Sequence, residues 1–214
     1  MKIRSLYELE EALDNDLAWR KREFSLITGM VEKANGPKKD TLLRAAITLM
    51  YSHWEGHIKK SAEIYITYLN CLGHKYLDMK DNFGHLSLSD KFEQGFSIKR
   101  YTSQKEVFDY IQSGLNCSFK VNCEKIIDTE SNLKSHVILN LLSQLGLDTH
   151  TFELKKNFID KKLLKNRNSI AHGDRVDKND LLEAYSEIER DLLHMIETFH
   201  TYIRNAASNK EYLK

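Results

Sequence analysis

"TLLRAAITLMYSHWEGHIKKSAEIYITYLN", residues 41–70, carries a long and regular apolar pattern. Apolar side chains recur in it every three or four residues, which is the spacing of one buried face of an α-helix. The members of this stripe are Leu43, Ile47, Met50, Trp54, Ile58, Ala62, Tyr65 and Leu69. The pattern predicts one long helix, and Asp40 is suited to be its N-cap residue.

Similar helical patterns lie on both sides of this stretch. A first helix is expected over about 5–34, and "NGPKKD" at 35–40 separates it from the second. The apolar positions of the first helix are Leu6, Leu9, Leu13, Leu17 and Phe24. Later helices are expected over 128–148, 149–172 and 181–205. The candidates for the N-cap of the last one are Asp177, Asn179 and Asp180. With one proline in 214 residues, the chain is expected to be an all-α helical bundle.

Residues 73–129 are less regular, and glycine recurs in them at Gly84, Gly95 and Gly114. Within this segment, 102–111 is expected to be a short helix capped by Thr102 or Ser103, and 117–126 a small hairpin or an extended strap. We therefore expect a single domain over 1–214 with an insertion at about 73–129.

The composition describes a soluble globular protein, with 41% hydrophobic and 29% charged residues. Because 32 Lys and Arg balance 31 Asp and Glu, any surface for nucleic acid must be a local patch. The first residues have no apolar core of a signal peptide, and no run of about eighteen apolar residues predicts a membrane span. Three cysteines without metal-ligand spacing, Cys71, Cys117 and Cys123, fit reduced thiols in a cytoplasmic protein.

The stretch "KNRNSIAHGDR", residues 165–175, gathers an arginine, a carboxamide and a histidine at an expected helix end. Asn168 and His172 are four residues apart and share a face, and the long side chain of Arg167 can swing across its edge. Gly173 follows where a left-handed residue is wanted. The set contains no activated nucleophile, which disfavours acyl transfer, whereas RNA brings its own nucleophile in the 2′-hydroxyl.

In such a reaction each of the three side chains has a task. His172 can take or return a proton, Arg167 can hold the non-bridging phosphate oxygens, and Asn168 can orient the imidazole or donate to the phosphate. No metal or cofactor is needed. In-line attack requires a base and an acid on opposite sides of the phosphorus, so two copies of the motif in a two-fold dimer are expected. The simpler alternative is a surface arginine, a capping asparagine and a histidine favoured by the helix dipole.

The wording "RNSIAHG" resembles the Arg-x4-His signature of the HEPN superfamily, including the polar residue after the arginine. Three stretches, at 51–70, 128–148 and 161–174, are similar to MAE-type HEPN-like nucleases, which are related to the RiboL-PSP-HEPN group, and the resemblance spans about 42–204. It implies a homodimer whose composite cleft cleaves tRNA or other cellular RNA without metal, with Arg167, His172 and Asn168 as the site. It also implies a toxin–antitoxin or antiphage role, with an antitoxin or regulatory protein as a possible partner. Asp174 stands where some HEPN toxins carry a tyrosine that their antitoxin modifies, so that control is not expected here.

Two other classes of function compete with the nuclease. A catalytically inactive HEPN module would bind RNA, nucleotide or a partner protein, but it would not require the whole Arg167, Asn168 and His172 set. A zinc hydrolase could use His53 and His57, four residues apart, yet no third ligand is evident.

Further candidates lie near the long apolar stripe. Glu55, His57 and Lys60 are off its main line and are expected to support the site by orienting the catalytic groups or contacting phosphate. Aromatic residues at helical spacing are more often part of the core than platforms for base stacking. The aromatic residues with this spacing here are Tyr51, Trp54, Tyr65 and Tyr68. The lysine pairs at 38–39, 59–60, 155–156 and 161–162 are mostly solvated faces that could flank phosphates, and His194 and His200 are structural or exposed.

Overall fold

The computed structural model describes residues 2–91, 97, 99–130 and 132–214, with no side-chain description for 89–91. Every regular element in these residues is helical, and β-pairing is limited to two isolated bridges. None of the described helices combines the length and the apolar character that a membrane span needs. The expected all-α class is confirmed.

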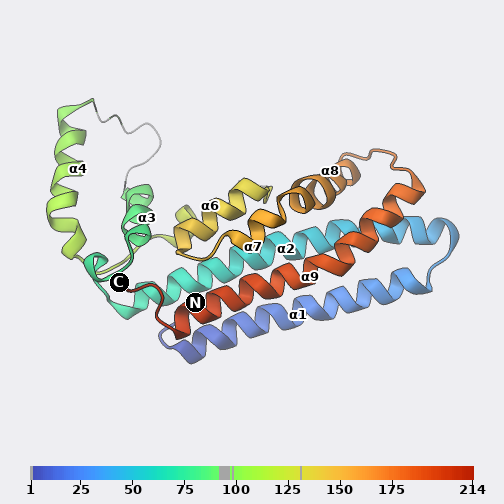
Figure 1. The fold of residues 1–214 in the computed structure, drawn as a ribbon, viewed down its shortest axis with the longest axis horizontal. Helices are drawn as coiled ribbons and strands as arrows, with labels where there is room; N and C mark the ends of the chain where they lie inside the picture. Colours follow the sequence, from blue (N-terminus) through green and yellow to red (C-terminus); the bar gives the residue numbers. More distant parts are fainter. Residues whose placement is uncertain (1, 92–96, 98, 131) are drawn as a thin grey trace.

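Three long helices form the body of the molecule and lie side by side: α1 (Leu6–Lys33), α2 (Gly36–Leu72) and α9 (Lys178–Ser208) (Figure 1). All eight members of the α2 stripe are at most 1% exposed, so the predicted buried face is confirmed. Helix α2 packs on both of the other two, which is why it carries the most continuous stripe.

The start of α2 differs from expectation. The helix begins at Gly36 and not after Asp40, because Pro37 occupies its first turn, where a missing backbone N–H costs nothing. Asn35 is the N-cap residue, without a side-chain hydrogen bond, and the Asp40 carboxylate lies 3.5 Å from Lys178 Nζ instead. The predicted cap of α9 is confirmed at Asp177, which accepts a hydrogen bond from the Asn179 backbone N–H.

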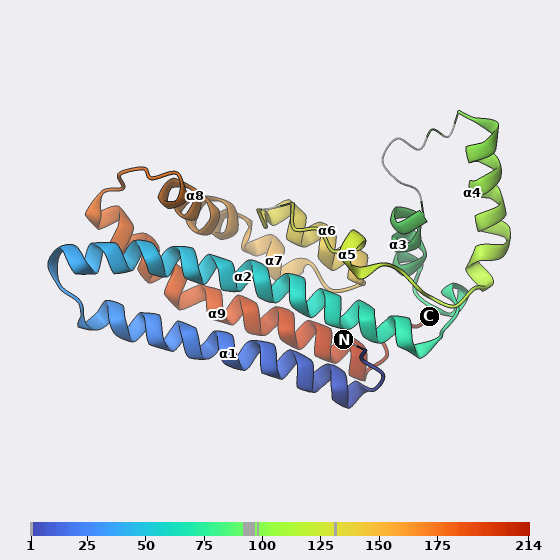
Figure 2. The same cartoon turned by 180° about the vertical axis from the view of Figure 1, so that it is seen from behind.

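A second layer covers α2 and α9 on one side (Figures 1 and 2). It consists of α6 (Ser135–Leu145), α7 (His150–Leu154), the π-helical segment η3 (Phe158–Leu164) and α8 (Lys165–Ala171). Phe152 of α7 packs between Trp54 of α2 and Phe199 of α9, at ring distances of 6.0 and 6.4 Å. Two predicted helices are thus corrected: the first begins only at Ser135, and the second is divided into three segments.

The insertion leaves the body of the bundle at the end opposite α8 (Figure 2). It contains η1 (Tyr76–Asp78), α3 (Asp81–Lys91), α4 (Tyr101–Ser113), η2 (Gly114–Asn116) and α5 (Cys123–Ile126). Arg100, not Thr102 or Ser103, is the N-cap residue of α4. In the part of the insertion that the structure describes, which excludes Gly95, no hairpin forms at 117–126; Ser118 makes a single bridge to Lys75. The expected strap holds only up to residue 122, because Cys123–Ile126 form the short helix α5. All three cysteines are free thiols.

Candidate functional site

The end of α8 is closed by glycine. Gly173 has a φ of 82°, its N–H donates to the Ile170 carbonyl at 3.1 Å, and the Asp174 N–H donates to the Ser169 carbonyl at 2.9 Å. This pair of bonds is the Schellman motif, which satisfies the last carbonyls of a helix. The left-handed glycine expected at this position is confirmed. His172 is the C-cap residue, and its side chain is exposed to solvent.

The loop after this helix end is attached to the beginning of α2. Arg44 Nη1 donates to the Asp174 carbonyl at 3.0 Å, and Lys178 pairs with Asp40 at the start of α9. These contacts join residues 130 or more positions apart in sequence. They attach the backbone that follows His172 to the bundle.

Arg167 lies one turn back along α8 and is half-buried. Its guanidinium carbon stands 4.7 Å from the centre of the Tyr51 ring, a cation–π contact. Its Nη1 donates to Asn132 Oδ1 at 2.9 Å and to Asn168 Oδ1 at 2.8 Å. The structure therefore brings Arg167 and Asn168 together directly, and the His172 backbone N–H binds the Asn168 carbonyl at 2.9 Å.

The hydrogen bonds of the Arg167 guanidinium come from one of its three nitrogens. A guanidinium has five N–H groups, and the two hydrogen bonds found among the described residues both leave from Nη1. The same residues place no carboxylate within ion-pair distance of Arg167. The positive charge and the Nε and Nη2 donors are therefore available to an anion such as a phosphate.

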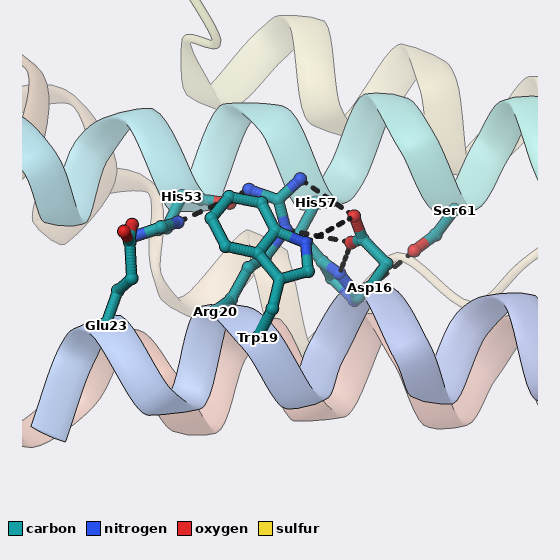
Figure 3. A network of polar contacts seen from close by, with 7 residues as sticks. All are labelled: Asp16, Trp19, Arg20, Glu23, His53, His57 and Ser61. Atoms are coloured by element: carbon teal, nitrogen blue, oxygen red, sulfur yellow. Dashed lines mark hydrogen bonds and ion pairs between the residues drawn. The ribbon is translucent and has the colours of Figure 1, made fainter.

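A second polar cluster lies between α1 and α2 and is drawn in Figure 3. Asp16 accepts from Arg20 Nε at 2.8 Å and bonds His57 Nδ1 at 2.7 Å, while Arg20 Nη1 donates to the His53 carbonyl at 3.2 Å. Burial alone would raise the pKa of Asp16, but the hydrogen bonds from His57 and Arg20 and the charge of Arg20 lower it to about 2. Sequence analysis missed this network, because Asp16 and His57 are 41 residues apart.

Part of this cluster has the order of a hydrolase triad. His57 Nδ1 bonds Asp16, and His57 Nε2 lies 3.3 Å from Ser61 Oγ. Ser61 and His57 are both 0% exposed, however, so the hydroxyl does not reach a substrate. The arrangement is a satisfied buried network and not a nucleophile site.

The three supporting residues expected from sequence are placed differently. His57 belongs to the buried network and not to the surroundings of α8. Lys60 is exposed and, at about 100° per residue, lies about 180° around α2 from Tyr51. Glu55 is on the Tyr51 side: it accepts from Thr129 Oγ1 at 2.8 Å, and its charge contributes to the raised pKa of Tyr51.

The histidines proposed for zinc do not converge. His53 pairs with Glu23 at 3.0 Å, and His57 pairs with Asp16. The described stretches contain no group of three or more His, Cys, Asp or Glu side chains arranged for a metal ion. The four aromatic candidates on α2 are all at most 6% exposed, which confirms that they are core.

The lysines near α8 face a different side from Arg167. Lys162 pairs with Glu183 and Glu187 of α9 at 3.3 and 3.1 Å. Lys161 and Lys165 line an open hollow between α8 and α9 together with Lys162, Asp180 and Glu183. Because its lining contains both acidic and basic side chains, this hollow does not offer a uniformly positive surface to the phosphates of RNA. On α9, His194 is exposed and His200 is buried, as expected.

An all-α bundle that presents arginine, asparagine and histidine at the glycine-closed end of a short helix is the arrangement of a HEPN-type domain. The family model described as RiboL-PSP-HEPN matches residues 15–205, and the chain belongs to this family. The predicted membership of the HEPN superfamily is thereby confirmed. No curated protein and no solved structure matches the chain.

Proposed function

We propose that this protein is a metal-independent endoribonuclease. The 2′-oxygen of the substrate attacks the adjacent phosphorus, the bond from phosphorus to the 5′-oxygen breaks, and a 2′,3′-cyclic phosphate and a 5′-hydroxyl result. His172 moves a proton, Arg167 binds the non-bridging oxygens as negative charge grows on them, and Asn168 holds the arginine beside the histidine. The observation that carries the proposal is an Arg167 with no carboxylate partner among the described residues, on the same short helix that His172 closes with an exposed side chain.

The active form is a homodimer with a composite cleft. One histidine cannot both accept the proton of the 2′-hydroxyl and protonate the leaving 5′-oxygen from the opposite side. A two-fold axis near the α8 end would place a second His172 across the phosphorus. The exposure of His172 at the end of the bundle supports this arrangement.

The family and the resemblance of its motifs support a proposal for the biological setting. We propose a cytoplasmic toxin or antiphage effector that cleaves tRNA or other cellular RNA and is restrained by an antitoxin or regulatory protein. Asp174 occupies the place of the modifiable tyrosine of some HEPN toxins. Restraint through a protein contact is therefore favoured over modification of that position.

The test is cleavage of total cellular RNA and of a tRNA pool in EDTA by wild type, His172→Ala and His194→Ala. His194 is the matched control, since it is another exposed histidine, on α9. Wild type and the control are expected to cut and leave 2′,3′-cyclic phosphate ends, and His172→Ala is not. If none of the three folded proteins cuts, the alternative of an inactive HEPN module that binds RNA, nucleotide or a partner protein replaces the nuclease.

A further inference from the structure

We infer that Tyr51 and Asn132 are positioning residues that hold Arg167 ready for the phosphate. The inference rests on the proposed function for its catalytic meaning, but the hold on Arg167 is a property of the folded chain. It adds two residues outside the Arg-x4-His motif, one on α2 and one on the loop from Asp128 to Lys134, of which residue 131 is not described.

Tyr51 forms the floor under the guanidinium. Its ring is 1% exposed and cannot move away, and the Arg167 carbon stands 4.7 Å from its centre. A planar cation over an aromatic face is attracted by the ring and keeps its in-plane donors free. The Tyr51 ring therefore holds the guanidinium of Arg167 in place without a hydrogen bond from its N–H groups.

Asn132 helps to fix the direction in which Nη1 of Arg167 points. Its Oδ1 accepts from Nη1 at 2.9 Å, and Asn168 Oδ1 accepts from the same nitrogen at 2.8 Å. Both acceptors are neutral amides, so the positive charge of Arg167 is not cancelled. Two bonds to one nitrogen leave the opposite edge of the guanidinium, Nε and Nη2, for bidentate contact with phosphate oxygens.

The two positioning residues are themselves connected through the Tyr51 hydroxyl. This oxygen accepts from the Leu133 N–H at 2.8 Å, and Glu55, one turn further along α2, accepts from Thr129 Oγ1 of the same loop at 2.8 Å. Burial, and then the charge of Glu55, raises the pKa of Tyr51 well above its usual range, so the hydroxyl keeps its proton. Tyr51 thus has two contacts: its ring holds the Arg167 guanidinium, and its hydroxyl holds the loop on which Asn132 lies.

The consequence is a guanidinium that is oriented before RNA arrives. Preorganised donors act most strongly where charge develops, on the non-bridging oxygens in the transition state. Loosening Arg167 should therefore lower kcat more than it raises KM. Simple loss of a binding contact would instead raise KM with kcat unchanged.

The variants are Asn132→Ala, Tyr51→Phe and Tyr51→Leu, with Asn140→Ala as the matched control, because Asn140 lies on α6 outside these contacts. Asn132→Ala is expected to lower kcat about tenfold with KM changed less than about twofold. Tyr51→Phe keeps the ring and should lose less than Tyr51→Leu. Asn132 is half-buried on a loop, so its variant keeps the test valid if Tyr51→Leu does not fold.

A second readout is independent of RNA cleavage. The Arg167 Nε–H NMR signal, assigned by its loss in Arg167→Ala, is expected to be sharp and slowly exchanging in wild type and broadened in Asn132→Ala. Folded Asn132→Ala and Tyr51→Leu proteins with an unchanged Arg167 signal and wild-type kcat would overturn the inference. If wild type cuts no RNA, the proposed function fails, and the NMR signal alone decides whether Tyr51 and Asn132 hold Arg167.

Discussion

Two clusters in this molecule contain an arginine and a histidine, and they differ in how the charge is treated. In the network between α1 and α2, Arg20 is 6% exposed and its charge is compensated by Asp16 at 2.8 Å. At the end of α8, Arg167 is half-buried and its hydrogen bonds go to the neutral amides of Asn132 and Asn168. The comparison teaches that residue types alone do not mark a site. An arginine that is oriented but not neutralised is the stronger sign of an anion site.

The histidines differ in the same way. His57 is fully buried with Asp16 on one nitrogen and Ser61 near the other, whereas His172 caps a helix in contact with solvent. We expect the first cluster to stabilise the fold and the second to act on substrate. Variants of the two clusters should therefore separate stability from activity.

The largest expected effect is that of Arg167→Ala on cleavage. Removal of a preorganised cation that faces developing charge should lower the single-turnover rate about 10²–10³-fold. Arg167→Lys keeps the charge but not the planar fork and should recover only part of the rate. The measurement is the cleavage rate at saturating protein, and a rate within about twofold of wild type for Arg167→Ala would refute the assignment.

Asp16→Asn should have the largest effect on stability. Removing the carboxylate leaves Arg20 buried with its charge uncompensated, and breaking such a pair costs roughly 3 kcal/mol. Asp14→Asn is the matched control, two residues earlier on α1, because the Asp14 side chain is 57% exposed and pairs with His200 at 3.2 Å. It should cost less than about 1 kcal/mol. Denaturant unfolding measures both, and equal losses would show that burial does not distinguish the two carboxylates.

Much of the fold could be predicted from the sequence because α2 carries its burial pattern in its own periodicity. Every member of the stripe from Leu43 to Leu69 is buried as expected. The start of the helix was predicted less well, since Pro37 can serve as a first-turn residue as readily as a break. The division of 149–172 into three segments, including the π-helical η3, leaves no comparable mark in the spacing of apolar residues.

The candidate site likewise has a part that could be predicted from the sequence and a part that could not. Arg167, Asn168 and His172 share one short segment, so their association could be read from spacing along a helix. Their partners come from elsewhere in the chain: Tyr51 from α2, and Asn132 from a loop 35 residues away. No local pattern reports a contact between distant segments, which is also why the link between Asp16 and His57 was missed.

The buried histidines predict an intermediate effect of pH on stability. Burial, and then the charge of Arg20, lowers the pKa of His53 from 6.5, and burial, and then the charge of His57, lowers the pKa of His200. Below about pH 6.5 the unfolded chain therefore binds protons that the folded chain does not, and stability falls with falling pH. Each histidine should contribute less than about 1.4 kcal/mol per pH unit, because each ring binds at most one additional proton.

Thermal unfolding between about pH 7 and about pH 5.5 tests this expectation, with a fall in Tm of about 2–4 °C. His53→Gln and His200→Gln should each flatten the profile, whereas His194→Gln, at an exposed position, should leave it unchanged. A profile that stays steep in the first two variants would place the proton uptake elsewhere. Asp16, with its pKa of about 2, adds a further loss only at much lower pH.

The smallest expected effect concerns the end of α8. Gly173→Ala forces a side chain into a left-handed conformation and should cost about 1 kcal/mol, with a several-fold loss of cleavage as the His172 position shifts. Gly29→Ala is the control: Gly29 lies within α1 with no atom near an added Cβ, so the same change should stabilise by about 0.5–1 kcal/mol. If Gly173→Ala changed neither the stability nor the cleavage rate, the conformation of the helix end would not determine the position of His172.

The most direct test of the division between the two clusters is the cleavage rate of Asp16→Asn beside that of His172→Ala, on the same RNA, below the unfolding temperature of both variants. We predict that Asp16→Asn, although destabilised, cuts at nearly the wild-type rate, while His172→Ala keeps wild-type stability and cuts at least about 10²-fold more slowly. The opposite result, a folded Asp16→Asn protein without activity beside an active His172→Ala, would place the chemistry in the buried network and contradict the account.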